Sequence, residues 1–580
     1  MLSFSAILLT SIPLFAAEPS SHSLLPKTDP VTLECSQPGA IFSHPFFGTL
    51  SEQAAQSRLL SAIFDSPRFD RFRSLIQLTE QATKSDWQTL LSKLTAGGMV
   101  ASFQPGKNGG VSLVMTTVSS KFLKKSLNDI RRELLSRISP SQQVHLLKTE
   151  AYRNRKFYRL GNIAYLSAGK QLLIASSEAR LKHMIDRLPE KPIRHTASPS
   201  EAGKSTLRIQ LDLQTLRKTP GLKKALQTPA SDVGQVAILG GWLDILRHSS
   251  RLNFKVVLAK ESLGVQLESA LDEMKAEKLM PGFFAFGSSG KPAPLLMPAG
   301  TIYSASWFRD YRTLWQNRGR YLTKKTASQL EKNDQTVQQQ LSVIGGKTKP
   351  SVLFSGLGTH FRLVVLRQKE NDYKVNLNDR FPAFAGAVDL RDESQFREQI
   401  TPFLKGLGLI LTFGEQKMLV KNTTYRGQKL TSIRFRDDPV SASRTNQFRF
   451  QFSPTYCIAH HHFIMGSTVE SVRKVLDELM KTDIPFSEKS SDVQITERQY
   501  FSFEELANVL SDVQNGLAHR LTFSQGLSSD ASRKELAIFA NILKRFGKAT
   551  ATVSASESAV RYHVQIHFRS LSHSGGSSRD

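Results

Sequence analysis

The chain has 580 residues, of which 40% are hydrophobic, and its formal net charge is +27. This length predicts more than one domain, and the 35 Phe exclude a largely disordered chain, because disordered sequences are poor in aromatic residues. Two cysteines, Cys35 and Cys457, are too few for a disulfide-dependent scaffold. We expect two free, partly buried thiols, with a single bridge between them as the alternative.

Residues 2–17 form an apolar run that ends in small residues and precedes a polar stretch. This pattern is typical of a secretory signal peptide spanning 1–17, so we expect export to the periplasm, the cell envelope or the medium. A short membrane anchor is the alternative, although Pro13 and the short length disfavour a spanning helix. No later run approaches about 20 apolar residues, so we expect no further membrane span.

Basic residues occur in both halves of the chain rather than in one dense tail. Outside the cytosol, such a charge can meet phospholipid headgroups, acidic envelope polysaccharides or stray DNA. Charge informs about association and not about fold or reaction. An anionic envelope polymer or lipid surface is therefore the expected partner, and a solvated surface without a cognate polyanion is the alternative. Nucleic acid binding would require a cytosolic location.

The chain repeats its own hydrophobic pattern. A helical stripe with spacing i, i+4, i+7, i+11 occurs twice, 273 residues apart. Its members are Leu123, Leu127, Ile130 and Leu134, recurring as Phe396, Ile400, Phe403 and Leu407. Tyr152-Arg153 recurs as Tyr425-Arg426 at this offset, and Leu172–Leu188 aligns with Phe463–Leu479 at an offset of 291. The growing offset predicts a longer hairpin loop between Thr431 and Pro454.

Each copy predicts strand, helix, strands, helix, strand, helix and hairpin in that order. The predicted fold class is therefore α+β, with two tandem homologous modules, each a mainly antiparallel sheet with helices packed on one face. The predicted boundaries are 24–275 for the first module, 276–294 for the linker, 295–569 for the second module and 570–580 for a disordered tail. Locally, Ser467 and Glu470 predict a capping box, and Trp315–Ile344 predicts one long exposed helix.

Several runs, densest in the second copy, resemble an uncharacterised family of exported proteins from planctomycete-type bacteria. They are Trp315–Arg318, Leu357–Val365, Phe381–Ala385, Tyr425–Gly427, Arg434–Phe435 and Phe452–Pro454. The resemblance implies export and the architecture described above. The family has no assigned activity, cofactor or catalytic residue, so the resemblance implies no chemistry.

Short motifs do not predict a nucleotide or metal site. Gly203–Thr206 resembles the end of a phosphate-binding loop, but Ser198 replaces the required glycine and a strand is expected to follow. His460–His462 offers two ligands on one strand face, and no third ligand completes the site. His563 and His567 would lie roughly 13 Å apart in a strand, too far to share an ion. We predict no cofactor and no metal ligands.

Catalytic signatures are equally lacking: there is no His-Glu-x-x-His stretch and no Gly-x-Ser-x-Gly elbow. Basic residues alternate with aromatic residues at Phe69–Arg73, Tyr152–Tyr158 and Trp307–Tyr321, which indicates either a stacking surface or amphipathic core elements. We favour core elements. No catalytic residue is predicted.

The sequence therefore favours an exported, non-catalytic envelope or periplasmic protein that binds an anionic partner. The alternative is an exported hydrolase that acts on an acidic polymer through a motif-poor site. Such a site would be assembled in space and would not be visible as a motif.

Overall fold

The computed structural model describes residues 23–569 with internal gaps. The gaps are 27, 43, 65, 67–69, 107–108, 140–146, 189–204, 272–281, 285–292, 343–348, 370–371, 374–376, 378, 414–417, 436–446, 482–493 and 557. The predicted signal peptide (1–17) and tail (570–580) therefore lie outside the described residues, as does most of the predicted linker. Within the linker, Phe283 and Phe284 are described and buried, so this part of the segment packs in a core.

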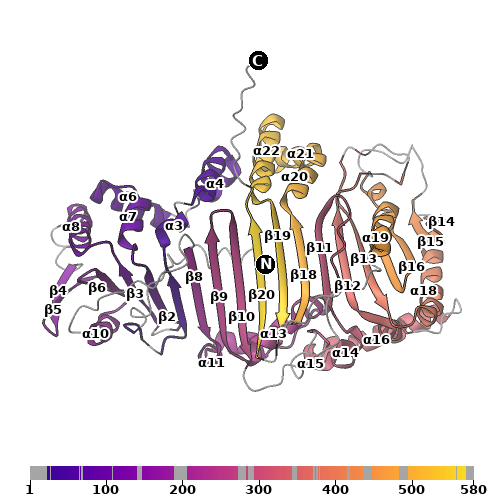
Figure 1. The fold of residues 1–580 in the computed structure, drawn as a ribbon, viewed down its shortest axis with the longest axis horizontal. Coiled ribbons are helices and arrows are strands. Elements are labelled where there is room, and N and C mark those ends of the chain that lie inside the picture. The colour runs from indigo at the N-terminus through magenta and orange to yellow at the C-terminus, as the bar shows by residue number, and fades with distance from the viewer. Residues whose placement is uncertain are drawn as a thin grey trace, which may run out of the picture. The chain divides into compact units, whose positions relative to one another are not determined.

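The fold is α+β, as predicted, and its sheets are antiparallel (Figure 1). The chain divides into two compact units. Unit 1 contains residues 1–224 and 250–268, and unit 2 contains 225–249 and 269–580. The predicted boundary near residue 275 differs from this division, because residues 225–249 belong to unit 2. Ile245 of this segment packs there in a core with Phe283 and Val553.

The strands of the first half are β1 (Val31–Cys35), β2 (Met99–Gln104), β3 (Gly110–Thr116), β4 (Leu147–Tyr152), β5 (Arg155–Leu160), β6 (Ile163–Ala168), β7 (Gln171–Ala175), β8 (Ser205–Asp212), β9 (Ser249–Ala259) and β10 (Ser262–Leu271). Its helices are α3 (Pro38–Phe42), α4 (Pro45–Gln56), α5 (Arg58–Phe64), α6 (Asp70–Thr83), α7 (Trp87–Leu94), α8 (Ser120–Ser136), α10 (Glu178–Asp186), α11 (Leu213–Leu216), α12 (Pro220–Gln227) and α13 (Val233–His248).

The strands of the second half are β11 (Thr301–Phe308), β12 (Leu357–Leu366), β13 (Ala383–Leu390), β14 (Leu419–Tyr425), β15 (Gln428–Arg434), β16 (Thr455–Ala459), β17 (His462–Gly466), β18 (Gln494–Ser502), β19 (Lys548–Ala555) and β20 (Ala559–His567). Its helices are α14 (Tyr311–Gln316), α15 (Arg318–Tyr321), α16 (Lys324–Ser342), α17 (Pro350–Gly356), α18 (Glu393–Phe413), α19 (Val469–Lys481), α20 (Phe503–Asp512), α21 (Gln514–Gln525) and α22 (Ser529–Phe546), with a 3-10 turn at Gln447–Gln451.

Strand pairing follows the same scheme in the two halves. In the first half the neighbours run β10-β9-β8-β1-β2-β3-β7-β6-β5-β4. In the second half they run β20-β19-β18-β11-β12-β13-β17-β16-β15-β14. The connection from β15 to β16 spans residues 435–454, whereas β5 and β6 are joined by two residues. The predicted lengthening of this hairpin is confirmed.

Two side-chain contacts recur at corresponding positions of the scheme. Ser176 accepts a hydrogen bond from the Val111 amide at 2.9 Å, and Ser467 accepts one from the Phe384 amide at 2.9 Å. Each serine thereby ties the start of a helix to the neighbouring strand. The predicted capping role of Ser467 is wrong, because Thr468 caps α19 through a 3.1 Å hydrogen bond from the Ser471 amide.

The second recurring contact joins a hairpin turn to the next helix. In the first half, Asp186 of α10 lies 2.8 Å from Nε of Arg153 and accepts a 3.4 Å hydrogen bond from Tyr152. In the second half, Asp477 of α19 lies 2.9 Å from Nε of Arg426 and accepts a 3.0 Å hydrogen bond from the Tyr425 hydroxyl. Both arginines have positive φ, 48° and 49°, as two-residue hairpins require.

Helices pack on both faces of β6 and β16, so the prediction of helices on one face is wrong. In unit 2, Cys457 of β16 packs toward α19, while the adjacent Ile458 packs with Phe396 of α18. Side chains of a strand alternate between faces, and apolar residues at consecutive positions therefore require a partner on each side. In unit 1, Val114 packs with residues of α10, whereas Leu113 and Met115 pack near Cys35 on the other face.

The predicted long helix Trp315–Ile344 is divided into α14, α15 and α16. The Asn317 side chain donates to the Thr313 carbonyl and ends α14. Leu322 is extended (φ −101°, ψ 155°), and Thr323 then caps α16 by accepting from the Thr326 amide at 3.2 Å. The aromatic residues of this region pack on each other and on β12 and α17, with Trp307 stacked on Phe361 and Trp315 against Phe354.

Candidate anion-binding site

A cavity of about 220 Å³ lies between α8 and the strands β5 and β6 of unit 1. Its lining residues are Lys124, Leu127, Asn128, Arg131, Lys156, Tyr158, Tyr165 and Ser167. Strand alternation explains this set. Phe157 and Leu166 point into the core beneath α10, so their neighbours on β5 and β6 face the opposite side, where α8 contacts β6 (Figure 1).

Two phenol rings stack along one wall of the cavity, and a guanidinium group lies over one of them. Tyr158 and Tyr165 are paired across β5 and β6, with ring centroids 5.4 Å apart and planes inclined by 25°. The Arg131 guanidinium carbon lies 4.8 Å from the Tyr158 centroid, a cation–π distance. Its Nη2 donates to Asn128 Oδ1 at 3.0 Å. The Tyr158 ring and Asn128 hold the guanidinium group in place, and its remaining N–H groups can bind an anion.

The cations of the cavity lack acidic partners. Among the described residues, no carboxylate oxygen lies within 4.0 Å of a charged nitrogen of Lys124, Arg131 or Lys156. The acids on α8 serve cations outside the cavity, since Asp129 pairs with Arg132 at 3.0 Å and Glu133 with Arg137 at 2.9 Å. The cavity therefore presents positive charge that the described protein does not neutralise.

A hydroxyl group completes the cavity. The Oγ atom of Ser167 is buried and has no hydrogen-bond partner in the described part of the chain. A buried polar atom without a partner costs free energy, and such an atom in a cavity indicates a ligand or solvent partner. Burial raises the pKa of the neighbouring Tyr165, while the Arg131 charge acts in the opposite direction. The cavity combines three cations, a hydroxyl group and two phenol rings.

The sequence singled out Tyr152–Tyr158 but favoured a core role for its aromatic residues. The structure divides the stretch: Phe157 is fully buried in the core, whereas Lys156 and Tyr158 line the cavity. The α8 residues were missed. Lys124 and Arg131 are seven residues apart, which places them on one helical face, and this spacing was the available signal.

The stretch His460–His462, which the sequence offered as an incomplete ligand set, is part of a hydrogen-bond network. His460 and His461 have φ values of 52° and 58° and form the turn between β16 and β17. Arg362 Nη2 lies 2.6 Å from His462 Nε2, and His462 Nδ1 lies 2.6 Å from the His460 carbonyl oxygen. A guanidinium group can only donate, so Nε2 accepts and the ring proton is on Nδ1.

Next to this turn, Asp389 of β13 binds His360 of β12. Its carboxylate accepts from the His360 amide at 2.7 Å and lies 3.2 Å from His360 Nδ1. Burial acts to raise the pKa of Asp389, but the hydrogen bonds from His360 outweigh it and the pKa is lowered. Gly358 makes room for this carboxylate, because a Cβ at that position would lie 2.2 Å from Asp389 Oδ2.

Burial lowers the pKa of Arg362 to about 10, with Asp389 opposing the change. No group of three or more His, Cys, Asp or Glu side chains in the described ranges is arranged to hold a metal ion. The arrangement thus ties a turn to the sheet and offers no ligand set.

The remaining sequence motifs are distributed as follows. Gly203 and Lys204 lie outside the described residues, while Ser205 and Thr206 begin β8, the predicted strand. His563 and His567 both lie in β20, paired with Thr552 and Lys548. Phe69 lies outside the described residues.

Both cysteines are free and buried. Burial raises the pKa of Cys35 to about 12 and that of Cys457 to about 11, so neither thiol is activated as a nucleophile.

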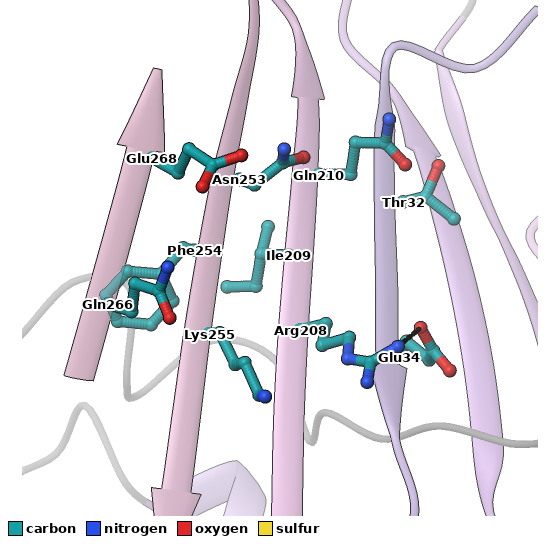
Figure 2. A pocket seen from close by; sticks show the side chains of 10 residues that line it. All are labelled: Thr32, Glu34, Arg208, Ile209, Gln210, Asn253, Phe254, Lys255, Gln266 and Glu268. Carbon is teal, nitrogen blue, oxygen red and sulfur yellow. Dashed lines mark ion pairs between the residues drawn. The ribbon is translucent and has the colours of Figure 1, made fainter. Parts of the chain in front are cut away.

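A second polar concavity, of about 300 Å³, lies on one face of β1, β8, β9 and β10 in unit 1 (Figure 2). Its polar side chains form two rows: Thr32, Gln210, Asn253 and Glu268 in one, and Glu34, Arg208, Lys255 and Gln266 in the other. Glu34 and Arg208 lie 3.6 Å apart. Two acids and two bases balance each other on this face, so it does not favour an anion as the first cavity does.

In the part of the chain that the structure describes, no helix has the length and apolar character needed to cross a membrane. No protein-family model matches the sequence, and no curated protein matches it. Among solved structures, crystal form IV of TP0453 is similar with 9% identity over 47% of this chain and 89% of that chain, at a TM-score of 0.24. Crystal form I of TP0453 gives 10% identity and a TM-score of 0.23 over the same shares. TM-scores this low do not indicate a shared fold.

Proposed function

We propose that the chain consists of two tandem homologous modules that arose by duplication. Three observations support this: the common strand-pairing scheme, the two serine contacts to strand amides, and the two Tyr-Arg turns bound to an aspartate. The sequence offsets predicted these correspondences, since Val111 and Phe384 are 273 residues apart and Asp186 and Asp477 are 291 apart. The family resemblance described above is part of the same proposal.

We further propose that the protein is exported and acts in the periplasm or envelope as a non-catalytic binding protein for an anionic partner. The observation that carries this function is the cavity beneath α8, where Lys124, Arg131 and Lys156 face no described carboxylate. The net charge of +27 adds a long-range attraction that raises the rate of encounter with a polyanion.

The alternative, an exported hydrolase, needs two convergent acids or a nucleophile with its base. The walls of the cavity contain neither an acid nor a histidine. The balanced face shown in Figure 2 has Glu34 and Glu268 in different rows. Neither set of lining residues places two acids together or a nucleophile beside its base, so binding is the function that we put forward.

Retention on an acidic polysaccharide resin tests the binding function. We expect the purified protein to bind at low salt and to elute as salt approaches a few tenths molar, because the Debye length falls to about 10 Å at 0.1 M. A neutral polysaccharide resin is the control. Retention that does not depend on salt, or equal retention on both resins, would contradict the proposal.

Export is tested separately by cell fractionation of a bacterium that expresses the chain with its own N-terminus. We expect the protein outside the cytoplasm, with a new N-terminus after Ala16 or Ala17. A cytoplasmic protein that retains Met1 would exclude the proposed location and would reopen nucleic acid as the partner.

A further inference from the structure

We infer that the cavity beneath α8 binds a phosphoryl group, as found in phosphate monoesters. This inference rests on the proposed function and narrows its anionic partner to one chemistry. The donors come from three elements: Lys124 and Arg131 from α8, Lys156 from β5, and Ser167 from β6. They surround the ligand from several directions, which suits a tetrahedral anion.

The number of donors favours phosphate over carboxylate. A carboxylate carries one charge and two oxygens, and the guanidinium group of Arg131 alone can satisfy it with two parallel hydrogen bonds. Binding a carboxylate would leave two ammonium groups facing a cavity without a described acid. A phosphate monoester carries a charge of about −1.5 to −2 at pH 7 and three acceptor oxygens. Its charge and oxygens match the two lysines, the arginine and the hydroxyl.

The rest of the cavity suits the group that carries the phosphate. Leu127 and the Tyr158 and Tyr165 rings supply an apolar wall, and Asn128 supplies an amide. A volume of about 220 Å³ holds a phosphate with a small substituent, such as one sugar ring or a glycerol unit, and little more. The lysines are exposed at the rim, so a longer chain can continue into solvent.

Isothermal titration of the full chain at constant ionic strength tests the chemistry. Glucose 6-phosphate and inorganic phosphate should bind at least about tenfold more tightly than glucuronate and acetate, because more charged hydrogen bonds form. Equal affinities for phosphates and carboxylates would overturn the phosphoryl inference.

Variants locate the binding in the cavity. Lys124→Met, Lys156→Met and Arg131→Gln should each weaken phosphate binding by about tenfold to a hundredfold, the size of one charged hydrogen bond. Lys125→Met is the matched control, since Lys125 is exposed on the same helix and does not line the cavity. Lys124 and Lys156 are exposed, so their replacement leaves the core intact. Unchanged binding in Lys124→Met and Lys156→Met would overturn the assignment.

A filling variant gives an independent test. Ser167→Ile places in β6 the residue found at the corresponding position of β16, Ile458, and should abolish phosphate binding. Retained phosphate affinity in this variant would contradict the assignment. Salt-dependent retention on the acidic resin tests the proposed function alone, so a protein that passes that test and binds no phosphate would refute only the present inference.

The phosphoryl group can belong to a soluble ester or to a lipid. Co-sedimentation with phosphatidylcholine vesicles, with and without phosphatidic acid, separates these sources. Sedimentation only with phosphatidic acid, lost in Lys124→Met but not in Lys125→Met, assigns a lipid headgroup. Binding of glucose 6-phosphate without sedimentation assigns a soluble ester. Absence of both overturns the inference.

Discussion

Two helix–sheet interfaces have the same place in the strand-pairing scheme: α8 on β6 in unit 1, and α18 on β16 in unit 2. They differ in the side chains that fill them. In unit 1, Arg131 and Ser167 line a cavity at this interface. In unit 2 the residue 273 positions after Arg131 is Leu404, and the residue 291 positions after Ser167 is Ile458. Both pack with Phe396. The backbone scheme thus permits either a binding cavity or a solid core, and the choice depends on a few side chains.

The difference has an energetic side. Burying an aliphatic side chain such as Ile458 stabilises a fold by about 1.5–3 kcal/mol, whereas a buried hydroxyl without a partner costs about 1–3 kcal/mol. Ile458 therefore stabilises unit 2, whereas Ser167 at the corresponding position destabilises unit 1. A buried hydroxyl in a cavity needs a compensating partner, and a bound anion is that partner in our proposal.

The largest loss of stability is expected when the apolar packing between α18 and β16 is removed. Ile458 is 7% exposed, and Ile458→Ser removes its packing and buries a new hydroxyl, so we expect a loss of about 3–5 kcal/mol in the free energy of unfolding. Chemical denaturation of the full chain measures it. Ile163→Ser, at a residue that is 49% exposed in β6, is the control and should change little. A loss below about 1 kcal/mol would show that the interface between α18 and β16 is not tightly packed.

A smaller, pH-dependent effect is expected at Asp389, whose place in the first half is occupied by Thr116. Asp389→Asn should cost about 1–3 kcal/mol at neutral pH through the weakened hydrogen bonds to His360. The folded-state pKa is lowered from 3.8, so its stabilisation is present above about pH 4 and is lost as pH falls through the lower value. Unfolding curves between pH 6 and pH 2 should show less acid loss in the variant. Parallel acid profiles would contradict this assignment.

Filling the cavity between α8 and the strands β5 and β6 should change the free energy of unfolding even less. Ser167→Ile removes a buried hydroxyl without a partner and adds apolar volume to a cavity, so gains and crowding offset each other within about 1.5 kcal/mol. Thermal unfolding of the variant beside the unaltered protein measures it. A destabilisation above about 3 kcal/mol would mean that the cavity has no room for the added carbons.

The smallest effect is expected at the two thiols, one in each unit. Because burial raises both pKa values to about 11–12, iodoacetamide at pH 8 should leave Cys35 and Cys457 unmodified in the folded protein and label both after denaturation. Intact-mass spectrometry provides the measurement. Rapid labelling of one thiol in the folded state would identify the unit that opens more readily.

Hydrophobic spacing in the sequence predicted the order of elements from β3 to β10 and from β13 to β20, the antiparallel class and the longer β15–β16 connection. It did not predict the repeated strand, helices and strand that precede β3 and β13. The cap of α19 was misplaced by one residue, since Ser467 is used by a strand amide that is 83 residues away. The broken helix after Trp315 was missed although its signal is local, because the Asn317 and Thr323 side chains bind backbone groups three or four residues away. The position of the α19 cap, in contrast, depends on a contact between a helix start and a distant strand, which no local pattern records.

The candidate cavity could be predicted only in part. The alternation of basic and aromatic residues in Tyr152–Tyr158 was visible in the sequence. The lack of described acids beside the cavity's cations, and of a hydrogen-bond partner for the Ser167 hydroxyl, results from the packing of α8 on β6. Helices on both faces were likewise missed. Consecutive apolar residues such as Cys457 and Ile458 indicate a strand that is buried on both faces, and this signal was not used.

The tautomer of His462 makes this side chain hard to replace. Its Nε2 accepts from Arg362 of β12 while its Nδ1–H donates to the His460 carbonyl oxygen, so one ring joins β12 to the turn before β17. A side chain that only donates, such as Lys, or only accepts, such as an ionised Glu, could satisfy one of these two partners and not both.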